Sequence, residues 1–313
     1  MNSDAISTLQ QQLSSALSNP PSETRRIFHG RGLCWPGLEH VTADWLQGIV
    51  MVALFREPAP SEMAALKRML SELIEAPEWQ HSGAHTLLLQ HRYLPDSATE
   101  WICGELTDTW QITENGLRYQ LDIGKKQNSG LFLDMRYGRQ WVQQQASGKR
   151  ILNLFAYTCG FSVAAIEGGA EHVVNLDMAR SALSRGRDNH RLNGHDLSKV
   201  SFLGHELFMS WGKVKKYGPY DLIIIDPPSF QKGSFALTRD YQKILRKLPE
   251  LLSANGTVLA CVNDPGIGPD FLIEGMANDA PALRYVERLE NQPEFNESDP
   301  QGGLKALVFK LGA

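Results

Sequence analysis

The chain has 313 residues, of which 42% are hydrophobic and 21% charged, and its formal net charge is −4. These values are ordinary for a globular protein and argue against a surface coated with basic residues, although a local basic groove remains possible. The four cysteines lack metal-ligand spacing, no apolar stretch approaches the ~20 residues that span a bilayer, and residues 1–18 do not resemble a signal peptide. We therefore expect a cytoplasmic protein with reduced thiols, no metal site and no membrane partner.

The first part of the chain predicts a polar N-terminal extension and then a small α+β unit. A helix over 6–17 ends before Asn19-Pro20-Pro21, and a second helix begins at Pro60. Asn115-Gly116 is a strong signal for a hairpin turn. Strands are expected at 41–45, 48–55, 86–90, 101–106 and 117–123.

From about residue 135 the pattern changes to alternating strands and helices. Strands are expected at 150–155, 173–177, 200–202, 222–226, 257–262, 284–290 and 304–311, and helices at 139–147, 160–167, 179–192, 206–216, 238–253 and 268–278. This alternation predicts an α/β fold with a doubly wound, mostly parallel sheet. The expected domains are an extension (1–24), a small α+β domain that recognises substrate (25–123) and a catalytic domain (124–313).

The first strand of the second part leads into a turn that suits a nucleotide-like cofactor. The strand over 151–155 is followed by Ala156-Tyr157-Thr158-Cys159-Gly160-Phe161-Ser162 and a helix. Because Gly160 is the only glycine of this turn, a dinucleotide pyrophosphate is disfavoured, and with it a dehydrogenase. A cofactor without phosphate, such as S-adenosylmethionine, fits better.

Polar residues follow the next three strands at corresponding places. Asp177 can accept hydrogen bonds from both ribose hydroxyls, or can simply cap the helix that follows it. His205 or Glu206 can meet the adenine amino group, and the residues do not decide between them. The buried-type strand Leu222–Ile225 ends in Asp226-Pro227-Pro228-Ser229-Phe230, where two prolines leave backbone carbonyls outside the sheet. The regular placement of these polar residues predicts a ligand site.

Three segments carry a resemblance to a known family. They are Asn128-Ser129-Gly130-Leu131-Phe132-Leu133-Asp134-Met135-Arg136, Asn153-Leu154-Phe155-Ala156-Tyr157-Thr158-Cys159-Gly160-Phe161 and Asp226-Pro227-Pro228-Ser229-Phe230. They resemble the class I S-adenosylmethionine-dependent methyltransferases that modify bacterial large-subunit ribosomal RNA at cytosine C5 or guanine N7. The resemblance covers roughly residues 25–312 and implies a Rossmann-like methyltransferase sheet. A PUA domain, which some members carry at the N-terminus, is not expected in residues 1–24.

The resemblance also implies roles for individual residues. Tyr157 and its turn would hold the methionine part of the cofactor, and the segment 128–136 would fold over the site. The residues that it places near the cofactor are Phe132, Asp134, Arg136, Asn153, Phe155, Tyr157, Thr158, Gly160, Asp177, His205 or Glu206, and Asp226. Those that it places at the target base are Asp226, Pro227, Pro228, Phe230 and Asn263.

One departure from the family pattern bears on the chemistry. Cytosine-C5 members carry a catalytic cysteine after the strand that corresponds to 257–262, but this chain has Asn263 at that position, while Cys261 lies two residues earlier. Asn263 resembles the guanine-N7 type, in which a ring nitrogen needs no covalent activation. Cys261 is interpreted as a small buried hydrophobic residue.

The expected function is methyl transfer from S-adenosylmethionine to a base of ribosomal RNA, at a ring or exocyclic nitrogen rather than at C5. The alternatives are a methyltransferase that acts on a protein or small molecule, and a non-catalytic RNA-binding module. The expected partner is RNA, and the sequence leaves monomer and homodimer open.

Overall fold

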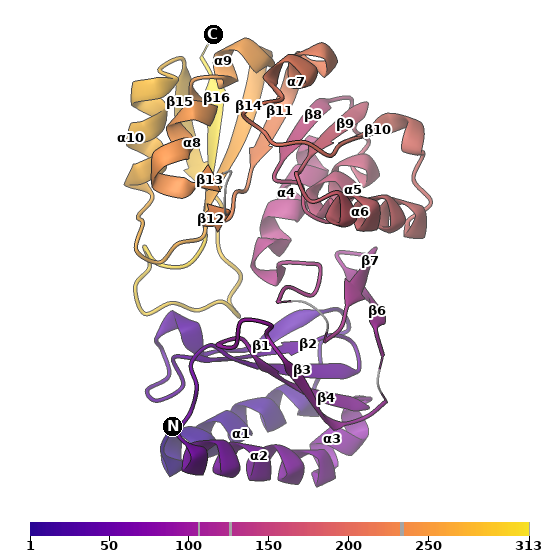
Figure 1. Cartoon of the computed structure of the whole chain (residues 1–313), viewed down its shortest axis with the longest axis vertical. Helices are drawn as coiled ribbons and strands as arrows, with labels where there is room; N and C mark the ends of the chain where they lie inside the picture. The colour runs from indigo at the N-terminus through magenta and orange to yellow at the C-terminus, as the bar shows by residue number, and fades with distance from the viewer. Residues whose placement is uncertain (106, 125–126, 232–234, 313) are drawn as a thin grey trace. The chain divides into compact units, whose positions relative to one another are not determined.

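The computed structural model describes residues 1–105, 107–124, 127–231 and 235–312, with only the backbone described for Phe230 and Gln231. The chain divides into two compact units (Figure 1). Unit 1 comprises Met1–Leu133 and Gln292–Asp299, and unit 2 comprises Asp134–Asn291 and Pro300–Ala313. Within the described ranges, every helix is too short or too polar to cross a membrane.

The two units divide the chain differently from the expected domains. The first boundary falls after Leu133 rather than after residue 123, and Gln292–Asp299 returns to unit 1. Residues 1–24 form part of unit 1, because the helix α1 (Ser3–Ser18) buries Leu9, Leu13 and Leu17 in its core. The 3.6-residue period of an α-helix places these leucines on one face.

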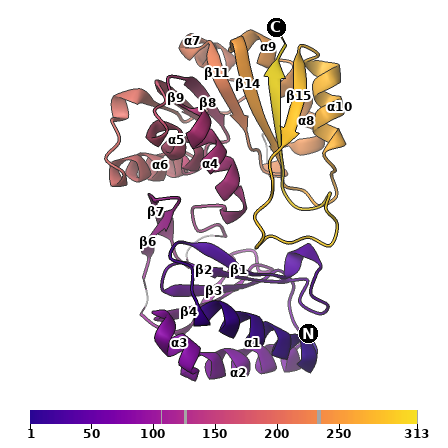
Figure 2. The ribbon, with the colours of Figure 1, turned by 180° about the vertical axis from the view of Figure 1, so that it is seen from behind.

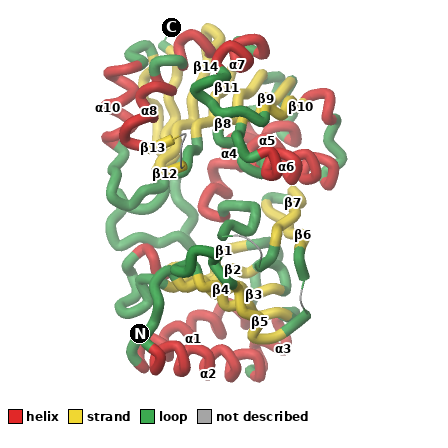
Figure 3. Tube along the Cα trace, viewed as in Figure 1, coloured by secondary structure: helices red, strands yellow, loops and turns green. Residues whose placement is uncertain are grey.

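Unit 1 is a five-stranded sheet with helices on one face. Its strands, in the spatial order β1-β2-β3-β4-β5, are β1 (Arg25–His29), β2 (Val41–Trp45), β3 (Ile49–Leu54), β4 (Thr86–His91) and β5 (Thr99–Cys103). Helices α1, α2 (Pro60–Glu75) and α3 (Pro77–Ser82) pack on this sheet in one core (Figure 3). The hairpin predicted at Asn115-Gly116 is present, formed by β6 (Thr109–Glu114) and β7 (Leu117–Asp122).

Unit 2 contains a seven-stranded sheet in the order β10-β9-β8-β11-β14-β16-β15. The strands are β8 (Arg150–Leu154), β9 (His172–Leu176), β10 (Val200–Leu203), β11 (Tyr220–Ile225), β14 (Leu252–Val262), β15 (Leu283–Arg288) and β16 (Lys305–Leu311). The first five in spatial order are parallel, and β16 runs antiparallel between β14 and β15 (Figure 2). The strand order reverses direction between β8 and β11, which makes this the topological switch point.

Helices cover both faces of the sheet in unit 2. Helices α4 (Arg136–Gln145) and α5 (Gly160–Glu167) pack on one face around Val142, Phe161 and Leu222. The other face packs against α7 (Trp211–Tyr217), α8 (Leu237–Leu245), α9 (Leu248–Leu251) and α10 (Asp270–Asp279). Helix α6 (Arg180–Leu192) packs through Leu183 on the turn after β8. The predicted doubly wound α/β fold is confirmed.

Two predicted helices differ from the structure for local reasons. The helix expected at 206–216 begins at Trp211, because the Glu206 carboxylate accepts hydrogen bonds from the backbone N–H groups of Phe208 and Met209 and holds a turn there. The helix expected at 238–253 is split into α8 and α9. Proline lacks an N–H and is favoured at the first positions of a helix, so Pro249 suits the start of α9 rather than the middle of a longer helix.

Candidate active site

The ends of the parallel strands in unit 2 are in register, which brings their following residues together. Leu154 pairs with Leu176 on one side and with Ile225 on the other, and Ile225 also pairs with Ala260. Phe155, Asp177 and Asp226 are therefore the next residues on three neighbouring strands. This edge, at the switch point, is where ligands bind in open α/β sheets.

The turn after β8 has an unusual backbone. Phe155, Tyr157 and Cys159 adopt positive φ angles of 56°, 49° and 62°, a region that residues with a Cβ seldom occupy. Cys159 immediately precedes α5 and is fully buried, and Gly186 of α6 lies against its sulfur, where a Cβ on Gly186 would come within 2.3 Å of Sγ. Such strained conformations persist where the surrounding packing fixes them, and they cluster at functional sites.

Asp177 joins this turn to the end of β9. Its Oδ2 accepts a hydrogen bond from the backbone N–H of Tyr157 at 2.8 Å, and its Oδ1 accepts one from the N–H of Ala179 at 2.8 Å. Burial raises the pKa of Asp177, while these two hydrogen bonds act in the opposite direction. A carboxylate has about four lone-pair sites, so each oxygen can still accept a further hydrogen bond. The capping role and the ribose-binding role are thus compatible.

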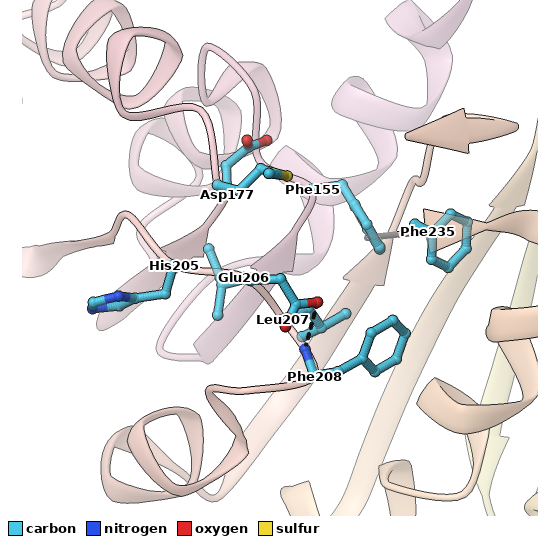
Figure 4. Close-up of a pocket in the computed structure, with 9 residues that line it drawn as sticks. Phe155, Asp177, His205, Glu206, Leu207, Phe208 and Phe235 are labelled. Carbon is cyan, nitrogen blue, oxygen red and sulfur yellow. Dashed lines mark hydrogen bonds between the residues drawn. The ribbon is translucent and has the colours of Figure 1, made fainter. Parts of the chain in front are cut away.

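A recess opens beside Asp177 (Figure 4). It encloses about 280 Å³ of empty space, part of it open to solvent. Its lining is mostly apolar and comprises Phe155, Leu176, Asp177, Met178, His205, Glu206, Leu207, Phe208 and Phe235. The rings of Phe155 and Phe235 meet edge to face with centroids 5.0 Å apart, so the aromatic wall is formed by residues from different elements.

His205 and Glu206 both line the recess but are engaged differently. The His205 ring lies 2.9 Å from Lys213 Nζ and points away from the side where Phe155, Phe208 and Phe235 gather (Figure 4). The Glu206 carboxylate accepts hydrogen bonds from Phe208 N at 3.1 Å and Met209 N at 2.9 Å. Glu206 therefore shapes the backbone that borders the recess, whereas His205 contacts the helix that follows.

The ends of β11 and β14 carry a second group of polar residues. Asn263, directly after β14, donates a hydrogen bond from Nδ2 to Asp134 Oδ2 at 2.5 Å. Burial and the nearby negative charge of Asp134 raise the pKa of Asp226 to about 7, while the Arg139 guanidinium lowers it. Asp134, Asp226 and Asn263, which the sequence assigned to different roles, thus form one electrostatic cluster.

Cys261 lies in the core beside this cluster. Its side chain is fully buried, and its backbone carbonyl accepts a hydrogen bond from the Tyr241 hydroxyl at 3.2 Å. Burial and the charges of Asp226 and Asp134 raise the pKa of the Cys261 thiol well above its usual range. Since the thiolate is the nucleophilic form, this cysteine is unsuited to attack a base.

Several residues that the resemblance places near the cofactor do not line the recess, and their roles stay predictions. Asn153 is buried within the sheet and donates to Asn175 Oδ1 at 2.9 Å, as part of a polar pair between β8 and β9. Thr158 is buried, and its carbonyl accepts a hydrogen bond from Asn189 Nδ2 at 3.0 Å. Gly160 and Arg136 begin α5 and α4, and Arg136 is buried. Phe132 is 45% exposed and belongs to unit 1.

The residues that the resemblance places at the target base are described in the structure to different extents. Pro227 is buried and Pro228 is exposed, directly after Asp226. The side chain of Phe230 lies outside the described part of the chain, so its predicted place beside the base stays a prediction.

Sequence reasoning missed three kinds of contact. The recess is also lined by Met178, Leu207 and Phe208. These residues come after strand ends, so their positions in the sequence could have indicated that they contact a ligand. Phe235 reaches the recess from a strand, β13 (Phe235–Ala236), that no sequence pattern indicated. Arg139 lowers the pKa of Asp226, and this effect depends on tertiary packing alone.

The recess fits the adenosine part of S-adenosylmethionine. An apolar slot with aromatic walls suits a purine ring, and the partly buried carboxylate of Asp177 at its edge suits ribose hydroxyls. The backbone of the 155–159 turn, held by Asp177, lies next to that carboxylate. Among the described residues that line the recess there is no lysine or arginine.

Comparisons with known proteins agree with this geometry. The sequence profile of the S-adenosylmethionine-dependent methyltransferase family matches residues 25–310. The chain is similar to ribosomal RNA large subunit methyltransferase I of Aeromonas salmonicida (38% identical, 65% of this chain, 54% of the relative). It is also similar to ribosomal RNA large subunit methyltransferase K/L of Shewanella frigidimarina (32% identical, 70% and 32%). The chain spans about half the length of the curated type I relatives that it matches.

Solved structures share the fold. A candidate SAM-dependent methyltransferase from Streptococcus mutans superimposes with a TM-score of 0.85 at 23% identity, covering 98% of this chain and 81% of that one. The SAM-dependent methyltransferase from Agrobacterium tumefaciens superimposes with a TM-score of 0.65 at 18% identity, covering 93% and 90%. At these identities the likeness shows the fold and carries no argument about the substrate.

Proposed function

This chain belongs to the S-adenosylmethionine-dependent methyltransferases, and from that premise we propose that it methylates a nitrogen atom of a base in large-subunit ribosomal RNA. The observation that carries the choice of nitrogen is the acceptor end of the site. A partly exposed Asp226 and an exposed Asn263 stand there, while Cys261 is buried with a raised pKa.

The cofactor supplies an electrophilic methyl group when bound. The residues of this chain then have to place a nucleophilic atom in line with that methyl at about 3–3.5 Å. Asp226 and Asn263 offer hydrogen-bond acceptors and donors for the edge of a base, and the backbone after Asp226 is stiffened by Pro227 and Pro228. A nitrogen acceptor has its own lone pair, so positioning by these groups suffices without a covalent enzyme–base bond.

A proton balance supports the role of Asp226. With a pKa of about 7, its carboxyl is close to half ionised at neutral pH. An exocyclic amine that gains a methyl group must lose a proton, and a carboxylate of this pKa can accept it. A ring nitrogen that carries no hydrogen, such as guanine N7, requires no proton transfer, and Asp226 would then only orient the base.

RNA as the acceptor is supported by the names of the relatives and by local charge. Residues 180–216 hold eight lysines and arginines against three aspartates and glutamates, although the whole chain is acidic. Within this stretch Arg187 stacks over the Phe202 ring at 4.5 Å, and Arg180 Nε lies 3.4 Å from the Gly204 carbonyl. These side chains line β10 up to the recess, and such a basic edge suits phosphate groups.

The experiment compares ribosomal RNA from a strain that lacks the gene with RNA from its parent by nucleoside mass spectrometry. We expect one methylated nucleoside to disappear from the large-subunit RNA, and to return when the purified protein and S-adenosylmethionine are added. An unchanged nucleoside profile would contradict the RNA assignment and would favour a protein or small-molecule acceptor.

A further inference from the structure

Lys305 is an unusual residue in unit 2. It is the first residue of β16 and its side chain is fully buried. Lysine is almost never fully buried unless it is paired, because removing an ammonium group from water costs several kcal/mol. Its Nζ donates a hydrogen bond to the backbone carbonyl of Asp264 at 2.6 Å. A bond from a charged donor is among the stronger hydrogen bonds in proteins.

The carbonyl that Lys305 holds belongs to a tight turn. It also accepts a hydrogen bond from the N–H of Ile267 at 3.1 Å, and the Asp264 carboxylate accepts one from the N–H of Gly266 at 2.9 Å. The turn begins directly after Asn263. Strand pairing places Lys305 opposite Val262, so the ammonium reaches the turn from the neighbouring strand.

Asn263 is therefore fixed from two sides. Its side chain donates to Asp134 Oδ2 at 2.5 Å, and the main chain that follows it is held by Lys305. Asn263 itself is exposed and directly follows the end of β14. The Asp134 that receives its hydrogen bond also acts electrostatically on Asp226.

The segment before Lys305 is anchored as well. The guanidinium of Arg288 donates from Nη2 to the carbonyl of Leu304 at 3.1 Å and to that of Gly302 at 3.3 Å. Arg288 ends β15, which pairs with β16. The start of β16 is thus a rigid support from which the Lys305 side chain extends.

We propose that Lys305 is a positioning residue for methyl transfer: its buried ammonium fixes the turn at Asp264 and so holds Asn263 in the place where the acceptor base binds. The predicted effect of Lys305 on the methyl-transfer rate rests on the proposed function. Its hydrogen bond to the Asp264 carbonyl does not. An apolar residue of similar length would fill the same volume without the desolvation cost of a buried charge. Because burying the Lys305 ammonium costs free energy, we infer that Lys305 serves a role other than stabilising the fold.

The test uses Lys305→Met, with Lys310→Met on the exposed side of the same strand as the control. We expect Lys305→Met to lower the rate of methyl transfer to ribosomal RNA at least tenfold, to leave the Kd for S-adenosylmethionine within twofold, and to keep the melting temperature. Hydrogen exchange at the amides of Gly266 and Ile267 should become faster in Lys305→Met and stay unchanged in Lys310→Met. If Lys305→Met does not fold, Lys305→Gln replaces it with the same expectations.

A double-mutant cycle separates positioning from a general effect. In the Asn263→Ala background, Lys305→Met should lower the transfer rate less than twofold further, because residues that act through one another are not additive. An equal loss in both backgrounds, or unchanged exchange at Gly266 and Ile267, would overturn the inference. If the wild-type protein methylates no RNA, the proposed function fails, while the exchange measurement still decides whether Lys305 holds the turn.

Discussion

The two halves of the strand-end crevice in unit 2 are lined by different kinds of side chain. The cofactor half, at the ends of β8, β9 and β10, is an apolar recess with one carboxylate, Asp177, which two backbone N–H groups hold in place. The acceptor half, at the ends of β11 and β14 and the start of β16, concentrates Asp134, Asp226, Asn263 and Lys305. Asn263 donates a hydrogen bond to Asp134, and Lys305 donates one to the carbonyl of Asp264.

This difference matches what each half has to do. An adenosine group can be recognised by shape and a few backbone-held acceptors, as in most small-molecule sites. A reacting base needs its atoms oriented by polar groups that contact it. Changes in the cofactor half should therefore alter binding of S-adenosylmethionine, and changes in the acceptor half should alter the transfer rate.

The largest expected effect is in the acceptor half. Asp226→Asn removes the ionisable group while keeping its shape, and we expect the transfer rate to fall about 100-fold, on the scale typical of a positioned acid or base. Single-turnover transfer to RNA measures this rate, and calorimetry should show a Kd for S-adenosylmethionine within threefold of wild type. Asp270→Asn, exposed at the start of α10, is the control. A Kd that rises as much as the rate falls would remove the distinction between the two halves.

Asp177→Ala should have the opposite profile. It removes the acceptor for the ribose and for the backbone of Tyr157 and Ala179, and hydrogen bonds to a charged group contribute about 1.5–3 kcal/mol. We expect the Kd for S-adenosylmethionine to rise about 10- to 100-fold, while the transfer rate at saturating cofactor changes little. Asp196→Ala, an exposed carboxylate that caps a short helix, should leave the Kd unchanged. Unaltered binding by Asp177→Ala would exclude this recess as the cofactor site.

The pH dependence of transfer tests Asp226 in the intact enzyme. If its carboxylate accepts the proton of an exocyclic amine, the rate should be constant above pH 8 and fall as the pH drops through about 7, reaching a loss of about tenfold per pH unit below 6. Asp226→Asn should lose this dependence. A rate independent of pH between 6 and 8 would indicate a ring nitrogen without a hydrogen as the acceptor instead.

The same raised pKa has a consequence for stability. The folded protein holds the Asp226 proton to a higher pH than the unfolded chain does, so this contribution to stability is present at acid pH and is lost as the pH rises through about 7. Asp226→Asn should therefore gain stability relative to wild type at pH 8 and not at pH 4. Urea denaturation at the two pH values measures the difference.

The smallest effects concern the choice between His205 and Glu206. His205 points away from the aromatic side of the recess and contacts Lys213, so His205→Ala should change the Kd for S-adenosylmethionine less than twofold. Glu206→Ala releases the turn at Phe208 and Met209, and we expect a Kd about five to ten times higher, close to the loss of one hydrogen bond. The reverse order would assign the adenine contact to His205.

Much of the fold could be predicted from the sequence because its signals are local. The strand Leu222–Ile225 and the helix 160–167 were placed by their apolar patterns and by flanking residues. The start of α7 could not be placed, because it depends on how the Glu206 side chain bonds to its own backbone. The return of Gln292–Asp299 to unit 1 depends on tertiary packing that no periodicity records.

The residues of the site also divide into those that could be predicted from local sequence and those that could not. Asp177 and Asp226 could be predicted because each directly follows a strand, and register then brings them together. Asn153 lies inside β8, one residue before its end, and its buried side chain donates a hydrogen bond to Asn175 Oδ1 within the sheet. Lys305 gave no sequence signal, since only its burial and its bond to Asp264 set it apart from a surface lysine.

We propose that this strand-end site transfers a methyl group to a nitrogen of a ribosomal RNA base without a covalent thiolate. The most direct measurement is to incubate the purified protein with methyl-labelled S-adenosylmethionine and RNA from the deletion strain, and to identify the labelled nucleoside by mass spectrometry against N- and C5-methylated standards. We expect one nitrogen-methylated nucleoside, with full activity in Cys261→Ala. A C5-methylated pyrimidine, or activity that is lost in Cys261→Ala while the variant stays folded, would contradict it.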